Sequence, residues 1–149
     1  MNNLKLLKKK IKEKKIDYYF LSTTDEFLNE YVPEYNMRLK WLTNFSGSNG
    51  AVLISEKESF FFTDGRYLNQ AKKELTKDYD IHDQSIVSII NFIGKKLKKK
   101  KILIDTKLFS TKLLNQIKKK CEISNNKIIH DDENIIDSLC DARKKCLKN

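Results

Sequence analysis

The segment AVLISEKESFFFTDGRY, residues 51–67, contains two short apolar runs separated by charged residues. The runs at 51–55 and 59–63 have the length of β-strands, and the short polar connection between them predicts a β-hairpin. Thr63 or Asp64 then offers a side chain that can cap the start of a helix. This part of the chain therefore predicts a hairpin that leads directly into a helix.

Strand and helix patterns alternate on both sides of the hairpin. Further strands are expected at 16–21, 79–82, 102–105 and 128–130, and helices or helical turns at 4–11, 25–30, 38–45, 64–75, 86–97, 110–117 and 133–143. This alternation favours an α/β fold, a three-layer-like sandwich with a mixed, partly parallel β-sheet flanked by helices. With four Gly and one Pro, no stretch resembles a flexible linker, so we expect a single domain over residues 1–149.

The formal net charge is +10, and its excess lies in two lysine clusters at 1–15 and 94–101, whereas residues 16–93 are net acidic. Lysine supplies all but three of the basic side chains. Surfaces that recognise nucleic acids commonly use the planar guanidinium of arginine, and interleave it with aromatic side chains. We therefore expect no nucleic-acid partner, and a lysine-dependent binder of polyanions or anionic surfaces is the least favoured alternative.

Membrane insertion and secretion also lack support in the sequence. No apolar run approaches the roughly 20 residues that span a bilayer, so we expect no membrane partner. The lysines near the N-terminus are not followed by the apolar stretch of a secretory signal. Three cysteines, an odd number without a Cys-x-x-Cys pair, indicate reduced thiols in the cytoplasm.

Residues that could catalyse hydrolysis are sparse. His82 and His130 lie in separate expected strands, and no His-Glu-x-x-His motif accompanies them. The cysteines have no neighbouring base in the sequence that would activate a thiolate. The acidic residues 131–133 are interpreted as the start of a helix. We therefore predict no catalytic residue and no metal site in this chain.

Arg66 occupies the position with the clearest functional meaning. It follows the strand at 59–63, and α/β folds bind ligands where their strands end. A guanidinium there could hold a carboxylate or a peptide carbonyl through paired hydrogen bonds. Alternatively, Arg66 pairs with Asp64 or another nearby carboxylate and fastens the turn, and the spacing alone favours this second interpretation.

Three motifs occur in order along the chain: DEFLNEYVP at 25–33, RLKWLTNFSGSNG at 38–50 and TDGRYLNQA at 63–71. The series resembles the N-terminal domain of aminopeptidase P, also called Xaa-Pro aminopeptidase, of the creatinase and prolidase superfamily. The segment from 133 to 143 resembles the last helix of that domain. The resemblance extends over nearly the whole chain and implies the ribonuclease H-like fold of the family.

The resemblance also implies a division of labour. Full-length family members release the N-terminal residue from peptides with proline in second position. They use two divalent metals, typically manganese, that are bound in a later domain. The domain resembled here would cover the active-site cleft, contribute to peptide binding and associate with a second subunit in a homodimer. The chain alone would hold no cofactor and would be inactive.

Individual positions carry over from the family motifs. Arg66 would contact the substrate, and Asp64 and Tyr67 would hold its turn in place. Glu30, Arg38 and Trp41 also match motif positions, and we assign them structural roles. As an alternative to an enzyme domain, the chain could act as a stand-alone peptide-binding or protein-binding module with the same fold.

Overall fold

The computed structural model describes residues 2–23, 38–47 and 49–140, except for the side chain of Cys140. The strands are β1 (Tyr18–Ser22), β2 (Ala51–Ile54), β3 (Ser59–Thr63), β4 (Asp80–Asp83), β5 (Lys101–Ile104) and β6 (Lys127–His130). The helices are α1 (Asn3–Lys14), α2 (Arg38–Thr43), α3 (Leu68–Glu74), α4 (Ile89–Lys96), α5 (Thr111–Ser124) and α6 (Ile135–Cys140). Two short 3₁₀ turns, η2 (Gly65–Tyr67) and η3 (Thr106–Leu108), complete the described elements. The turn expected at 25–30 lies outside the described residues.

The strands form one mixed sheet in the order β4-β3-β2-β1-β5-β6. β2 runs antiparallel to β1 and β3, and every other neighbouring pair is parallel. The carboxyl ends of β1, β3, β4, β5 and β6 therefore lie at one edge of the sheet, which we call the carboxyl edge. The opposite edge, where these strands begin, is the amino edge. The predicted hairpin and the partly parallel sheet are confirmed.

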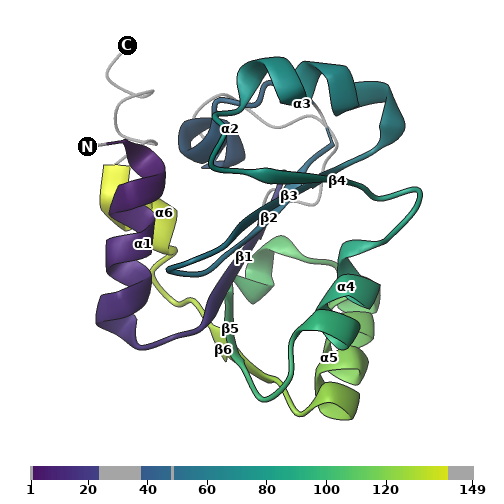
Figure 1. Cartoon of the computed structure of the whole chain (residues 1–149). Coiled ribbons are helices and arrows are strands. Elements are labelled where there is room, and N and C mark those ends of the chain that lie inside the picture. The colour runs from purple at the N-terminus through teal and green to yellow at the C-terminus, as the bar shows by residue number, and fades with distance from the viewer. Residues whose placement is uncertain (1, 24–37, 48, 141–149) are drawn as a thin grey trace.

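Helices cover both faces of the sheet. α1, α2, α3 and α6 lie on one face and α4 and α5 on the other (Figure 1). The apolar run of β3 is continuous because both faces of this strand are covered. On the first face Phe61 packs on Phe45, with ring centres 4.9 Å apart. On the second face Phe60 and Phe62 pack on Phe92, at 4.9 and 5.1 Å. A strand that is covered on both sides has no need for polar alternation.

The helix expected at 86–97 begins later than predicted. Ile86 fits the apolar periodicity, yet its side chain is 80% exposed and α4 starts at Ile89. The Ser88 hydroxyl caps the helix by accepting a hydrogen bond from Asn91 N at 3.2 Å. Before it, the Asp83 carboxylate accepts a hydrogen bond from Ser85 N and closes a turn. The cap and the turn therefore place the start of α4 after Ile86, which stays outside the helix.

The described helices are all too short or too polar to cross a membrane.

Candidate functional site

The turn that carries Arg66 is built where β3 ends at the carboxyl edge. Asp64 caps η2, because its Oδ1 accepts a hydrogen bond from Arg66 N at 2.9 Å. The preceding hydroxyl of Thr63 donates to the carbonyl of Asn49, and the Asn49 amide donates to Asp64 Oδ2 at 3.0 Å. The 46–50 loop and the turn after β3 therefore hold each other in place.

Arg66 and Asp64 form a forked ion pair within this turn. Nε of Arg66 donates to Oδ1 at 3.2 Å and Nη2 donates to Oδ2 at 3.1 Å. The hydrogen bonds from Arg66 hold the pKa of the Asp64 carboxyl below its usual range, and the carboxylate raises the pKa of Arg66. The interpretation that the spacing favoured, a pair that fastens the turn, is what the structure contains.

The Arg66 side chain stays accessible to solvent although it is paired with Asp64. Arg66 is 78% exposed, whereas Asp64 is only 22% exposed. A guanidinium carries five N–H donors, and the bonds to Asp64 use only Nε and one hydrogen of Nη2. The remaining donors are held in a fixed orientation at the carboxyl edge, where they can meet a carbonyl or carboxylate from solution.

Tyr67 ties the turn to the core. Its ring lies edge-on to Phe45 at 6.2 Å, and the Arg66 guanidinium lies 5.4 Å from the centre of the ring. The structure thus brings Asp64, Arg66 and Tyr67 together as one unit. Their role toward a substrate stays a prediction.

The glycine-rich loop at 46–50 packs tightly beneath this unit. A Cβ added at Gly50 would lie 2.9 Å from Phe61 Cζ and 3.0 Å from Leu39 Cδ2. Ser46 donates from both its backbone N and its hydroxyl to the Glu74 carboxylate, at 3.0 and 2.7 Å. The close packing of the backbone therefore leaves no room for a side chain at Gly50.

A crevice of about 200 Å³ opens at the same edge of the sheet. Its lining combines the apolar side chains of Phe20, Phe109 and Leu113 with polar Asn49 and Gln84. Asn49 also contacts Asp64, so the crevice adjoins the turn of Arg66. The crevice can accommodate a small apolar group, and Asn49 links it to the turn that carries Arg66.

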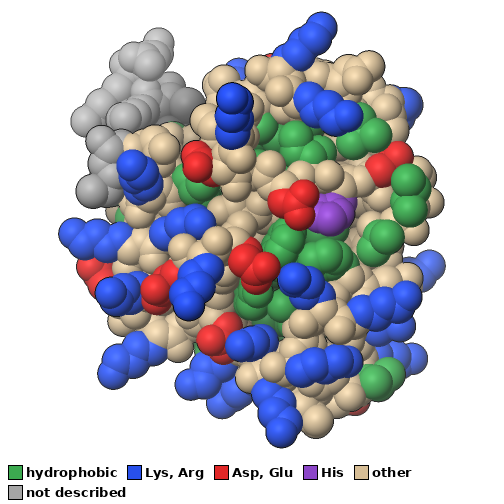
Figure 2. Space-filling view, in the orientation of Figure 1, with side chains coloured by type: hydrophobic (Ala, Val, Ile, Leu, Met, Phe, Trp, Pro, Cys, Tyr) green, Lys and Arg blue, Asp and Glu red, His purple; other side chains and the backbone are tan. Residues whose placement is uncertain are grey.

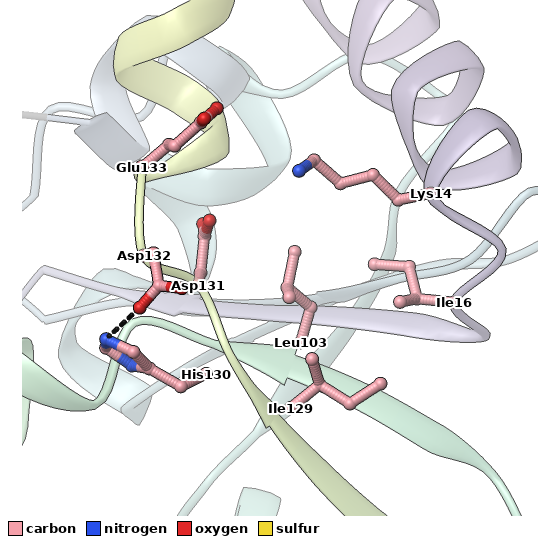
Figure 3. Close-up of a pocket in the computed structure, with 8 residues that line it drawn as sticks. All are labelled: Lys14, Ile16, Leu103, Ile129, His130, Asp131, Asp132 and Glu133. Carbon is pink, nitrogen blue, oxygen red and sulfur yellow. Dashed lines mark ion pairs between the residues drawn. The ribbon is translucent and has the colours of Figure 1, made fainter.

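A second pocket, of about 300 Å³, lies near the end of β6 (Figure 3). Lys14 reaches from α1 toward Asp131 and Glu133, and His130 pairs with Asp132 at 3.3 Å. Asp131 Oδ2 accepts a hydrogen bond from Ile135 N at 2.7 Å, which confirms that the acidic segment starts a helix. Burial raises the pKa of Asp131. His130, Asp131 and Asp132 are thus engaged in local structure.

The potential metal-binding side chains of the described residues lie apart from one another or in pairs. In residues 2–23, 38–47 and 49–140, no three His, Cys, Asp or Glu side chains form a group that could hold a metal ion. His82 and His130 each approach one aspartate, at 3.1 and 3.3 Å. The described residues therefore do not fit the two-metal centre that the resemblance implies for full-length enzymes.

Of the other motif residues, Arg38 has a structural role. It is buried, and its guanidinium donates to both oxygens of Asp137 at 3.0 Å. Trp41 accepts a hydrogen bond from Asn3 through its carbonyl. Glu30 lies outside the described residues. Sequence reasoning missed Asp137, because a partner 99 positions away leaves no local signal.

Comparison with known proteins identifies the family to which this chain belongs. The family described as Creatinase/Prolidase N-terminal domain matches residues 3–139. Xaa-Pro aminopeptidase 2 of Rattus norvegicus is 25% identical over 136 residues, which cover 90% of this chain and 20% of the relative. The chain thus spans about a fifth of that relative's length.

Solved structures show the same architecture. The X-prolyl aminopeptidase of Caenorhabditis elegans, described as a cytosolic enzyme with a di-nuclear active site, matches with a TM-score of 0.80 and 26% identity. This match covers 86% of the present chain and 22% of the enzyme. The N-terminal domain of the cytoplasmic peptidase PepQ from Mycobacterium tuberculosis matches with a TM-score of 0.71 and 21% identity, over 92% of this chain and 97% of that one. The second likeness concerns the fold alone.

Proposed function

Because this chain belongs to the creatinase/prolidase N-terminal domain family, we propose that it is the non-catalytic N-terminal domain of an Xaa-Pro aminopeptidase. The whole chain forms this one domain. It covers the active-site cleft, contributes to the binding of the peptide and takes part in subunit association within a homodimer. Release of the N-terminal residue from a peptide with proline second is carried out by a separate catalytic domain, which also holds the two divalent metals.

The position of Arg66 is the observation that carries the peptide-binding part of this proposal. Its side chain is charged and 78% exposed, and Asp64 holds it at the carboxyl edge. A pre-oriented guanidinium loses less conformational entropy when it donates to a peptide carbonyl or carboxylate than a mobile one. Arg66 therefore contacts the peptide, and Asp64 and Tyr67 act as positioning residues.

Two observations support a cytoplasmic location. The Caenorhabditis elegans relative is described as cytosolic and the Mycobacterium tuberculosis relative as cytoplasmic. In this chain, Cys121 is a free and buried thiol, and burial raises its pKa to about 11. A protonated thiol of this kind is compatible with a reducing compartment.

A titration with peptide tests the role of Arg66. The ¹⁵N-labelled chain would be titrated with the tripeptide Ala-Pro-Ala while backbone amide resonances are recorded. We expect saturable shifts at residues 64–67, and Arg66→Ala weakens binding about tenfold or more, because hydrogen bonds to charged groups are lost. Lys72→Ala, which removes another exposed cation, is the matched control. If Arg66→Ala binds the peptide as tightly as the unaltered chain, the proposed role of Arg66 is wrong.

The alternative, a stand-alone binding module, requires only that this fold can exist as a separate domain. The Mycobacterium tuberculosis match is a structure of an N-terminal domain alone, and this chain covers 97% of it. The DNA that follows codon 149 separates the two candidates. An in-frame continuation that encodes two Asp, one His and two Glu at ligand spacing supports the enzyme domain, whereas a stop codon there supports the module.

A further inference from the structure

Lysines from three separate segments converge at the amino edge of the sheet. Lys127 N donates to the carbonyl of Lys100 at 2.8 Å, and Lys99 N donates to the carbonyl of Ser124 at 3.3 Å. In the register of β5 and β6, Lys101 lies opposite Lys127. We call the exposed lysines of this region the basic end, namely Lys99, Lys100, Lys101, Lys118, Lys119 and Lys127. Figure 2 shows Lys and Arg side chains gathered over the part of the surface where α5 ends.

The neighbouring lysines have structural uses that the basic end lacks. Lys98 Nζ donates to the carbonyl of Gly94 at 2.7 Å and so closes α4, and Lys96 pairs with Glu58 at 3.5 Å. By contrast, no lysine of the basic end forms an ion pair with any carboxylate in the described part of the chain. Asp17, the nearby carboxylate at the start of β1, instead accepts a hydrogen bond from the Lys101 backbone N at 2.7 Å. Glu122 lies four positions after Lys118 on α5, so the six lysines of the basic end are partly balanced and the region stays net positive. A surface of this charge attracts anionic partners.

An exposed apolar residue, Ile123, also lies in this region. This large apolar side chain is 78% exposed on the last turn of α5. It lies one helical turn after Lys119, on the same side of the helix. An exposed apolar side chain close to lysines is typical of proteins that rest on a membrane surface, where the cations meet headgroups and the apolar group enters the acyl boundary.

Nucleic acid fits this surface less well. Surfaces that bind single strands stack bases on aromatic side chains, and duplex recognition commonly relies on arginine. The segments 98–101 and 118–127, which form the basic end and its surroundings, contain neither arginine nor an aromatic residue. An exposed isoleucine has no favourable contact to make with a phosphate backbone.

We propose that the basic end docks on a membrane surface rich in anionic lipid, with Ile123 inserted among the headgroups. The contact is peripheral and requires no spanning helix, and it departs from the expectation of no membrane partner, which rested on the lack of a long apolar run. The basic end lies at the amino edge, opposite the turn of Arg66 at the carboxyl edge, so the two surfaces can be occupied at the same time. Each lysine close to an anionic surface strengthens binding about fivefold.

Vesicle flotation tests the proposal with the 149-residue chain. Vesicles of phosphatidylcholine with about 30% phosphatidylserine should carry the chain at low salt, and binding should fall steeply as salt screens the charges. The triple substitution Lys99→Gln, Lys100→Gln and Lys119→Gln should weaken binding on the order of 100-fold. The matched control substitutes exposed lysines of another surface, Lys72→Gln, Lys73→Gln and Lys77→Gln, and should change binding less than about twofold. Thermal unfolding of both variants checks that they fold.

Ile123→Ser separates insertion from charge, because it leaves the net charge unaltered. It should weaken binding to the anionic vesicles about tenfold. Several results would overturn the proposal: equal binding to pure phosphatidylcholine vesicles, an equal loss in the control triple variant, or unchanged binding by Ile123→Ser. Binding of a single-stranded RNA through the same lysines, without binding to anionic vesicles, would identify the surface as a nucleic-acid site instead.

Discussion

Arg38 places a charged side chain inside the fold. It is 4% exposed and joins α2 to α6 through two hydrogen bonds to Asp137. Burial acts to lower the pKa of Arg38, but the hydrogen bonds and charge of Asp137 outweigh it and raise the pKa above its usual value. The guanidinium therefore stays charged and depends on its partner.

Removing the partner should cost more than removing the pair. Asp137→Ala leaves the buried guanidinium uncompensated, and we expect the free energy of unfolding to fall by about 3 kcal/mol. The double variant Arg38→Met, Asp137→Leu should lose less, because it leaves no buried guanidinium without its partner. Urea unfolding of the three proteins measures both values. A double variant that is less stable than Asp137→Ala would show that the pair itself, and not the isolated charge, dominates the energy.

Asp64 reports on the Arg66 turn through its titration. Since Arg66 lowers the pKa of Asp64, the ion pair stabilises the turn above the ordinary carboxyl pKa and is lost as the pH falls through the lowered one. In Arg66→Ala, the pKa of Asp64 should rise toward its ordinary value of about 3.9. Side-chain ¹³C shifts followed against pH measure it. An unchanged pKa would mean that the pair does not form in solution.

Ser88 and Ile86 define where α4 begins. Ser88→Ala removes the capping hydroxyl and should lower the free energy of unfolding by about 1 kcal/mol. Ile86 lies before the helix and its side chain is exposed. Ile86→Ser should therefore change the free energy of unfolding by less than about 0.5 kcal/mol. Thermal or urea unfolding compares the two. A larger loss of stability in Ile86→Ser than in Ser88→Ala would instead support the longer helix that the apolar periodicity predicts.

Gly50 tests the packing of the loop against the sheet. Gly50→Ala brings a methyl group to 2.9 Å from the Phe61 ring, and we expect a loss of about 1–3 kcal/mol from overpacking. Gly65→Ala is the control, since its Cβ would meet only Asp83 Oδ2 at an ordinary 3.5 Å. Equal stability of the two variants, measured by urea unfolding, would contradict the tight packing at the loop.

The elements show which parts of the fold were predictable. The hairpin could be located because three charged residues separate two apolar runs, and the Arg66–Asp64 pair because the partners are two positions apart. The predicted start of this helix, at residue 86, was wrong. Ile86 fits the apolar periodicity of the helix, but periodicity does not show where a capping residue will begin it. The Arg38–Asp137 pair required the tertiary fold, because sequence alone does not reveal which arginine will be buried.

At the scale of the whole molecule, the two edges of the sheet carry different surfaces. The carboxyl edge holds the crevice and the turn of Arg66, whereas the amino edge holds the basic end and Ile123. The sequence placed Arg66 correctly at the end of a strand, but it could not show that lysines from three segments meet. That convergence depends on the parallel pairing of β5 with β6.

In the proposed division of labour, the peptide bond is cleaved by a domain outside this chain. The purified chain would be incubated with Mn²⁺ and Ala-Pro-Ala, and free alanine would be measured, with a full-length Xaa-Pro aminopeptidase as the positive control. We predict no release above the protein-free blank at any chain concentration. Alanine release that rises in proportion to the chain concentration and stops when the metal is chelated would contradict the claim.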